Sequence, residues 1–322
     1  MDLPTIMCQI YVASLVPTLE DRNEVIELNL APEEPTSFSN EEREEMEARY
    51  ASWMGYAAGF GVNCPRKHAP CYYSIVARFN DAISPSVAAH FKQIDKDIPR
   101  LSCSGIILEK DKDEHRSIVR QIAQVIALAR PDVGYCQGMD GVISKLLLLM
   151  LGDRERAYLA MMVLMDQYGM DEMYAPGLGG LTQHLNHFDL RVQEQLPDVY
   201  AVLVANEVDV ALYATEWFLR LFADSPSPAT VMDIIFKYGL SEGMEQLALM
   251  YLRDVSDLIL SHRSRPDAMA ELYDILKSVV SSTMVDEALL REEQQHQQQQ
   301  QQQQEQPRRR GWSRYFSCKL LP

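Results

Sequence analysis

Apolar residues recur at intervals of three and four along most of the chain, which is the spacing of one face of an α-helix. The segments with this spacing are 118–129, 157–168, 181–188, 210–221 and 244–259. No stretch shows the alternation of apolar and polar residues that marks a half-buried strand, and no repeat recurs at a fixed period. The pattern therefore predicts an all-α fold with a single multi-helix domain.

Composition divides the chain into three parts. Residues 1–40 become acidic and carry Pro32 and Pro35, which predicts a loosely ordered N-terminal arm. The helical patterns lie within residues 41–285, which we therefore expect to form the folded domain. Its first helix would begin at the cap Ser39-Asn40. Residues 286–322 begin with a glutamine-rich run, which cannot bury a core and predicts a disordered extension.

The 322 residues include 47% hydrophobic ones, which is ample for a packed core. The formal charge of −16 argues against nucleic-acid binding. Cys64, His68 and Cys71 stand close together, but no fourth ligand is near, so we predict no metal site. The six cysteines form no C-x-x-C pair, so reduced thiols and a cytoplasmic location fit best.

No targeting or membrane-spanning segment is predicted. The apolar residues 6–16 are short, interrupted and preceded by Asp2, so we expect no secretory signal. The apolar run Val142 to Leu151 is far shorter than the roughly 20 residues that cross a bilayer, and it predicts a core helix. The sequence also lacks the phosphate-binding loop, the hydrolase nucleophile motif, the zinc-protease motif and the kinase signature. If the protein is an enzyme, it must therefore act with very few catalytic side chains of its own.

One segment combines a core-facing side with a projecting cation. Ile94 and Ile98 are spaced to face a core, whereas Arg100 follows Pro99 and would point outward from a fixed position. Arginine forms planar, two-pronged hydrogen bonds with phosphate oxygens. Asp97 lies three residues before Arg100 and would tether it. An Asp–Arg pair at a surface is usually only an ion pair, so this segment alone leaves both interpretations open.

A polar turn lies between two apolar segments further along the chain. Pro131 and Gly134 end one helix and turn the chain, and Gly138 allows a close approach of the backbone. Tyr135 and Gln137 are thereby presented at the start of the next helix. The simplest interpretation of this stretch alone is a helix N-terminus whose two polar side chains satisfy backbone groups.

Taken together, these two segments resemble the paired signature of the TBC domain, the GTPase-activating domain of Rab regulators. The matching pattern is Ile94-x-x-Asp97-x-x-Arg100 followed by Tyr135-x-Gln137-Gly138-Met139. A third segment, 212–222, is similar to the family's helix with the pattern Tyr-x-x-x-Trp-Phe. The resemblance covers roughly Arg49 to Leu260 and implies a TBC-like all-α domain.

The resemblance implies a GTPase-activating protein that acts on a GTP-bound Rab-type small GTPase in vesicle trafficking. Arg100 would enter the nucleotide pocket of the GTPase and neutralise charge between the β- and γ-phosphates, and Gln137 would orient the attacking water. The chain would need no cofactor of its own, because the GTPase binds GTP and Mg²⁺. The residues that would support the two catalytic side chains are Asp97, Tyr135, Ile94 and Gly138.

The sequence also departs from the family pattern. Leu101 stands where a threonine is usual, and Phe236-Lys237 stands where Trp-Asp is common. The Gly-x-Pro that often leads into the segment starting at Arg49 is absent. Two alternatives to an active GTPase activator therefore stay open: a catalytically inactive TBC-fold module or scaffold that holds a small GTPase, and an unrelated all-α scaffold.

The end of the chain is cationic and aromatic on an otherwise acidic protein. Each cation near an anionic membrane surface contributes about 1 kcal/mol to binding. This composition suits peripheral contact with endomembranes, and a solvated tail without a partner is the alternative. The residues of this membrane-contact prediction are Arg308, Arg309, Arg310, Trp312 and Arg314.

Overall fold

The computed structural model describes residues 38–59, 72–76, 83–102, 111–265 and 267–285. Within these ranges the regular structure is helical throughout and no strand is found, which confirms the predicted all-α fold. Residues 1–37 of the predicted arm and the glutamine-rich tail lie outside the described residues, as do Cys64, His68 and Cys71. The domain boundaries at 41 and 285 stay predictions.

The helices are, in chain order, α2 (Asn40–Gly59), α3 (Tyr72–Val76), α4 (Pro85–Asp97), the 3-10 helix η3 (Ile98–Arg100), α5 (Lys112–Ala129), α6 (Met139–Leu149), α7 (Arg154–Tyr168), α8 (Met170–Tyr174), α9 (Gly179–Gln195), α10 (Pro197–Ala205), α11 (Val210–Leu219), α12 (Pro228–Tyr238), α13 (Leu240–Asp254), α14 (Ser256–Leu260) and α15 (Met269–Ser282).

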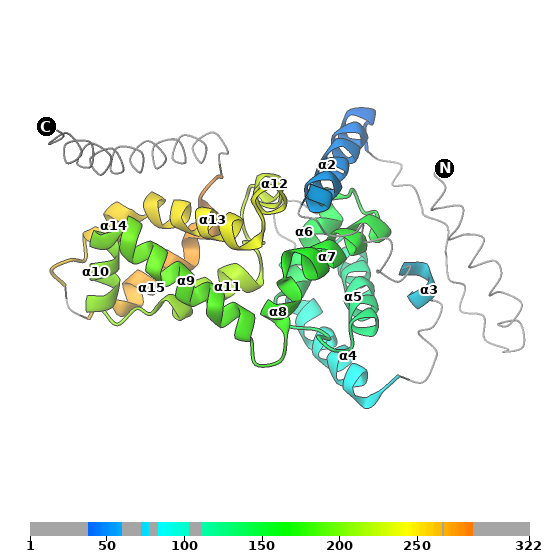
Figure 1. Cartoon of the computed structure of the whole chain (residues 1–322), viewed down its shortest axis with the longest axis horizontal. Coiled ribbons are helices and arrows are strands. Elements are labelled where there is room, and N and C mark those ends of the chain that lie inside the picture. Colours follow the sequence, from blue (N-terminus) through cyan, green and yellow to red (C-terminus); the bar gives the residue numbers. More distant parts are fainter. Residues whose placement is uncertain (1–37, 60–71, 77–82, 103–110, 266, 286–322) are drawn as a thin grey trace, which may run out of the picture.

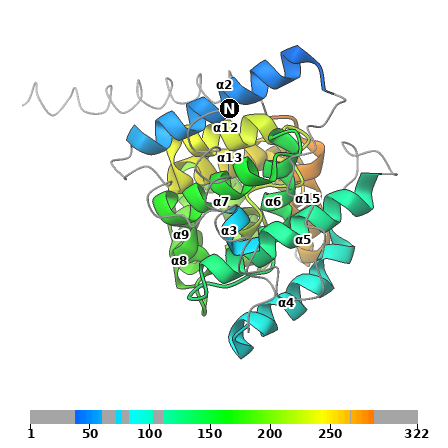
Figure 2. The ribbon, with the colours of Figure 1, turned by 90° about the vertical axis from the view of Figure 1, so that its right-hand side faces the viewer.

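These helices form an elongated body with two groups of packed helices (Figure 1). One group contains α2 to α8, and the other contains α9 to α11 and α13 to α15. α12 packs against α2 and α6 of the first group and against α13 of the second, so it joins the two. In the view turned by 90°, α2 and α4 lie at opposite ends of the first group (Figure 2).

α2 begins with a reciprocal cap, as the predicted helix start at Ser39-Asn40 requires. Ser39 Oγ accepts a hydrogen bond from Glu42 N at 3.2 Å, and the Glu42 carboxylate accepts one from Ser39 N at 2.7 Å. Further along, the fully buried Trp53 stacks on Phe236 of α12, with ring centroids 4.4 Å apart. Trp53 Nε1 also donates to Asp233 at 2.6 Å. These contacts fix α2 on α12.

α6 lies at the centre of the first group, against α5, α7 and α12. Most of its residues are buried, the polar Asp140 and Ser144 included. A helix that is apolar on nearly all sides belongs in a core, which explains the run from Val142 onward. No helix in the described ranges is both long and apolar enough to cross a membrane. Because α6 begins at Met139, its packing also fixes the position of the loop just before it.

Buried His115 of α5 makes the stability of the core sensitive to acid. Its Nε2 lies 2.8 Å from Ser144 Oγ of α6. Burial, together with the nearby cations Lys145 and Arg116, lowers the pKa of His115 from 6.5 to about 4. The folded state therefore favours the neutral imidazole, and stability that is present above pH 6.5 is lost as the pH falls toward 4.

We expect the free energy of unfolding to fall by up to about 3 kcal/mol between pH 7 and pH 4 because of this histidine. The variant His115→Gln keeps a hydrogen-bonding group without a titrating one, so it should lack this part of the decline. Urea denaturation of both proteins across the pH range measures the difference. Parallel curves of stability against pH would contradict the role of His115.

The predicted helix over 210–221 is wrong at its C-terminal end. α11 ends at Leu219, and Leu221 takes a left-handed backbone conformation with φ +44°. Leu221 is nevertheless fully buried, because the chain turns a corner that keeps its side chain in the core. Helical periodicity reports the burial of a residue and cannot show that the backbone has left the helix.

The predicted helix over 244–259 is two helices. α13 ends at Asp254 and α14 begins at Ser256, so the chain bends at Val255. The bend changes which residues face the core. Leu258, predicted to lie in the core, is 56% exposed, whereas Ile259 is fully buried.

Candidate functional site

α4 and η3 bring Arg100 to the surface. The first turn of α4 is capped by Ser84, whose Oγ accepts a backbone hydrogen bond, and proline follows at the first helical position. The helix tightens into η3 after Asp97. Ile94 and Ile98 are buried on one side, whereas the Arg100 side chain is 74% exposed. The buried isoleucines thus hold a short helical end from which the arginine projects.

Asp97 connects the two segments that the sequence singled out. This carboxylate is only 5% exposed, and its Oδ2 accepts hydrogen bonds from Gln93 Nε2 at 3.0 Å and from the Tyr135 hydroxyl at 3.3 Å. Its Oδ1 lies 3.8 Å from Arg100 Nη1. Two hydrogen-bond donors and one guanidinium therefore surround one buried carboxylate, which contacts both the arginine and the tyrosine two residues before Gln137.

Tyr135 is held through its backbone as well as its side chain. Its N donates to His90 Nδ1 of α4 at 3.1 Å, and its side chain is buried. Burial, with Asp140 and Asp97 close by, raises the pKa of Tyr135 above its ordinary value, so the hydroxyl stays a donor at neutral pH. The His90 ring lies so close to Gly134 that a β-carbon on that glycine would overlap it. Sequence reasoning missed His90, because a histidine on an amphipathic helix carries no separate signal.

Gln137 lies at the exposed tip of the following loop. None of the hydrogen bonds within the described ranges involves its side-chain amide. Two backbone amides of the loop make hydrogen bonds: Met139 N donates to Cys136 O at 3.2 Å, and Gly138 N donates to the Asp140 side-chain Oδ1 at 3.2 Å. Gly138 has φ +106°, a conformation that favours glycine. The backbone of this loop therefore sets the direction in which the Gln137 side chain leaves the chain.

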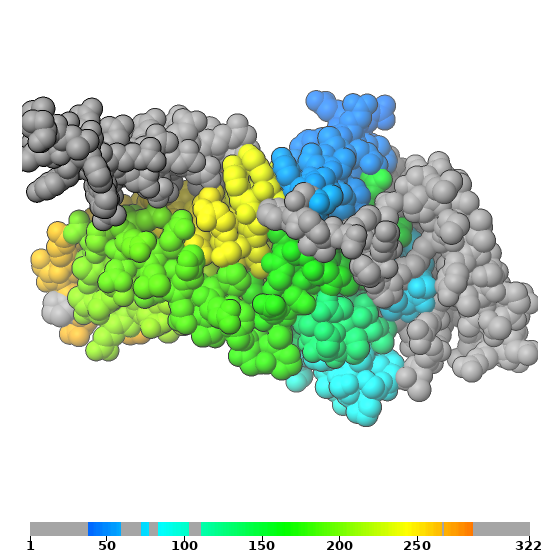
Figure 3. All heavy atoms as spheres, in the orientation of Figure 1, coloured from blue at the N-terminus to red at the C-terminus, as the bar shows by residue number. Residues whose placement is uncertain are grey.

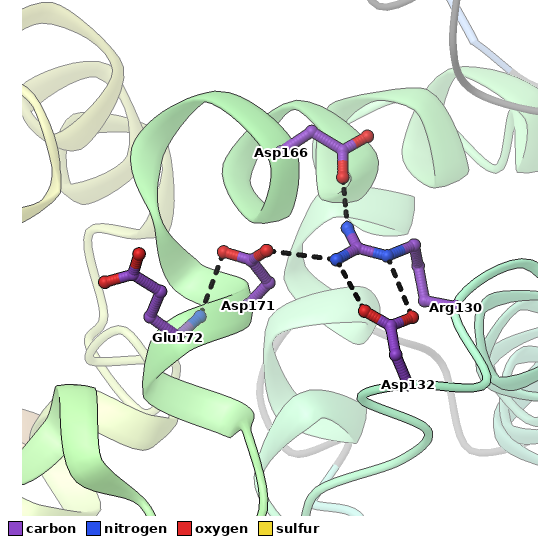
Figure 4. Close-up of polar contacts among 5 residues, drawn as sticks. All are labelled: Arg130, Asp132, Asp166, Asp171 and Glu172. Carbon is purple, nitrogen blue, oxygen red and sulfur yellow. Dashed lines mark hydrogen bonds and ion pairs between the residues drawn. The ribbon is translucent and has the colours of Figure 1, made fainter.

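A cluster of one arginine and three carboxylates anchors the turn ahead of the tyrosine (Figure 4). Arg130 Nη2 lies 3.2 Å from Asp132 and 3.0 Å from Asp171, and Nη1 pairs with Asp166. Asp166 is at the end of α7 and Asp171 is in α8, so the cluster ties the turn to both helices. The carbonyl of Arg130 also accepts from Gly134 N at 2.7 Å. Sequence reasoning missed this cluster, because two of its pairs are 36 and 41 residues apart.

The two projecting side chains, Arg100 and Gln137, are both exposed at the surface. A cavity of about 150 Å³ lies between α11 and α15, and its lining includes none of Arg100, Asp97, Tyr135 or Gln137. In the space-filling view, α4 (cyan) forms an outer edge of the molecule (Figure 3). The described residues contain no group of three His, Cys, Asp or Glu side chains suited to a metal ion. An exposed arginine and an exposed amide on a surface suit contact with a macromolecule better than enclosure of a small molecule.

The third segment singled out in the sequence has a packing role. Trp217 and Phe218 of α11 are buried, and the Phe218 ring meets the Phe188 ring of α9 with centroids 5.4 Å apart. This segment connects helices within the second group and presents its aromatic residues to the core.

Known proteins match the same part of the chain. A model of the Rab-GTPase-TBC domain matches residues 73–260, which is more than half of the chain. The chain is 31% identical over 154 residues to the Rab GTPase-activating protein eat-17 of Caenorhabditis elegans, covering 48% of this chain and 17% of that protein. It is also 31% identical over 169 residues to the GTPase-activating protein GYP5 of Saccharomyces cerevisiae, covering 52% of this chain and 18% of that protein.

The fold is similar to that in the crystal structure of the Chlamydomonas flagellar RabGAP TBC domain. The TM-score is 0.51 at 21% identity, and the match covers 85% of this chain and 93% of that chain. This likeness concerns the fold alone. The chain spans about a fifth of the length of the curated relatives named above.

Proposed function

Because the chain belongs to the Rab-GTPase-TBC domain family, we propose that it is a GTPase-activating protein for a GTP-bound Rab-type small GTPase. The observation that carries the proposal is the position of Asp97. Its buried carboxylate contacts Arg100 and hydrogen-bonds to Tyr135, so an exposed arginine and an exposed glutamine extend from two elements that are joined directly.

Phosphoryl transfer to water needs placement and charge stabilisation more than covalent help from a protein. In the proposed mechanism, Arg100 enters the nucleotide pocket of the GTPase, where its guanidinium neutralises charge developing on the phosphate oxygens. Gln137 accepts a hydrogen bond from the attacking water and orients it. GTP and Mg²⁺ are held by the GTPase, and this chain contributes the two side chains.

Asp97 and Tyr135 act as supports in this mechanism. Asp97 limits the directions that the Arg100 side chain can take, and the Tyr135 hydroxyl links the loop of Gln137 to the same carboxylate. Ile94 anchors the end of α4 in the core, and Gly138 permits the backbone conformation that follows Gln137.

The proposal is tested by adding the full chain to a panel of GTP-loaded Rab proteins and measuring phosphate release. Acceleration of hydrolysis by at least one Rab is the expected result. Tight binding that depends on GTP but gives no acceleration across the panel would instead support a catalytically inactive binding module of the same fold. Neither binding nor acceleration would support an all-α scaffold with another partner.

We also propose that the chain contacts anionic endomembranes through the cationic and aromatic residues 308–314, which would bring it to a membrane-bound Rab. The expected result is that the full chain sediments with vesicles containing phosphatidylserine, and that a chain ending at Gln306 sediments less. Vesicles of neutral lipid serve as the control. Equal sedimentation of the two chains on anionic vesicles would remove the proposal.

A further inference from the structure

The corner after α11 holds two strained residues in succession. Leu221 and Phe222 have φ +44° and +53°, a region that non-glycine residues enter at a cost of about 1–3 kcal/mol each. Both are almost fully buried, and Phe222 N donates to Trp217 O at 2.9 Å. The Phe222 ring also packs on the Tyr251 ring with centroids 5.4 Å apart. The core therefore holds this corner in one fixed conformation.

The fixed corner lies directly against the loop that carries Gln137. A β-carbon placed on Gly138 would be 3.2 Å from Leu219 O and 3.3 Å from Arg220 Cγ. One turn further along α6, a β-carbon on Gly141 would be 3.4 Å from Arg220 Cζ. The Arg220 side chain thus extends along the start of α6, from Gly138 to Gly141, immediately after the glutamine.

Two polar contacts hold the corner in this place. Arg220 Nη2 donates to Asp224 Oδ1 at 2.9 Å, and the side chain of Arg220 is only 22% exposed. Leu219 O accepts a hydrogen bond from the Tyr174 hydroxyl of α8 at 2.7 Å. The guanidinium is therefore engaged with a carboxylate of its own corner and lies beside Gly141, while the aliphatic stem faces Gly138.

We propose that Arg220 is a positioning residue for Gln137, and that it fixes the backbone of residues 136–141, the end of the loop and the first turn of α6, without touching the GTPase nucleotide. The inference rests on the proposed function. Because the loop backbone sets the direction in which the exposed Gln137 side chain leaves the chain, whatever supports Gly138 also limits the region that the amide can reach. The Arg220 stem supplies that support, and Asp224 keeps the stem extended.

The first test compares enzyme kinetics of Arg220→Ala and Gln137→Ala with a Rab that responds to the full chain. Arg220→Ala is expected to lower kcat by about 10- to 100-fold, as a displaced catalytic group does, with KM changed less than about twofold. In the Gln137→Ala background the added Arg220→Ala should cause no further loss. An unchanged kcat for the single variant, or an equal loss in both backgrounds, would overturn the proposal.

Arg220→Met separates the packing of the aliphatic stem from the charge of the guanidinium, because methionine keeps an unbranched stem and carries no charge. It should retain more of the kcat than Arg220→Ala, and its melting temperature should match that of the unchanged chain. Arg265→Ala is the control for the loss of an ion-paired arginine elsewhere, since Arg265 is 59% exposed and pairs with Glu271 at 3.0 Å. Loss of kcat in Arg220→Met equal to that in Arg220→Ala would contradict support by the stem.

Amide hydrogen exchange tests the same inference without any GTPase. Exchange of the peptide covering 136–141 should be faster in Arg220→Ala than in the unchanged chain, and a peptide from α10 should be unaffected. If no Rab is accelerated while the loop does exchange faster, the proposed function fails and the support of the loop stands. Unchanged exchange in this peptide would overturn the positioning role even where a Rab is accelerated.

Discussion

Arg100→Ala is expected to lower the stimulated rate of GTP hydrolysis by about 10³- to 10⁵-fold, which is what an arginine supplied in trans contributes to phosphoryl transfer. The side chain is 74% exposed and its nearest carboxylate oxygen, on Asp97, is 3.8 Å away. Only the guanidinium of this pair is exposed, and the buried Asp97 carboxylate keeps its hydrogen bonds from Gln93 and Tyr135 when Arg100 is removed, so the pair should contribute little to folding. The melting temperature should therefore stay within about 2 °C of the unchanged chain. Phosphate release under single-turnover conditions, with a responsive Rab, measures the effect.

Two further variants sharpen this experiment. Arg100→Lys keeps the charge and loses the planar two-pronged donor, so it should remain strongly impaired. Arg265→Ala removes an exposed arginine from another part of the surface and should stimulate hydrolysis as the unchanged chain does. Full stimulation by Arg100→Ala would show that Arg100 is not the catalytic arginine, whatever the activity of the chain.

Gly134→Ala is expected to destabilise the protein by about 2–4 kcal/mol and to displace the loop that carries Gln137. The glycine has φ +71°, and its missing side chain leaves room for the His90 ring. A methyl group there must push the ring away, which breaks the hydrogen bond that His90 Nδ1 accepts from Tyr135 N. Urea denaturation measures the loss of stability, and stimulated hydrolysis measures the loss of the loop's position.

Gly152→Ala separates the two causes of the expected loss, which are the backbone strain at a positive φ and the overlap with the His90 ring. Gly152 also has a positive φ, +85°, but a β-carbon there would meet nothing within 4 Å, so its replacement should cost only the backbone strain of about 1 kcal/mol. In the background His90→Ala, which removes the ring, Gly134→Ala should cost about the same small amount. Equal costs for Gly134→Ala and Gly152→Ala in the unchanged chain would contradict the close contact with His90.

Local pattern carries much of the fold and part of the candidate site. Helical periodicity predicted α5, α7, α9, most of α11 and the segment of α13 and α14, because each of these must bury one apolar face whatever its partner is. The positions of Arg100 and Gln137 were predicted for a similar reason: a proline region ends one helix before the arginine, and Pro131 with Gly134 turns the chain before the glutamine. Their chemical roles came from the resemblance to a family, and these roles stay predictions.

The contacts that support those two side chains could not be predicted from the chain alone. His90 and Tyr135 are 45 residues apart, and Asp97 and Tyr135 are 38 apart. Arg220 lies more than eighty residues beyond Gly138, at a corner where helical spacing had predicted that α11 continues through Leu221. Periodicity reports which side of a helix is buried, but it does not identify the element that covers it.

The sequence of this protein therefore determined where several helices run, most of their apolar faces and the places where an arginine and a glutamine leave them. Tertiary packing determined that Asp97 of α4 contacts both Arg100 and Tyr135. It also placed Arg220, at the corner after α11, against Gly138 at the start of α6. The physical reason is that a local pattern depends on the burial of single side chains, whereas the site depends on contacts among several elements that pack together only in the folded core.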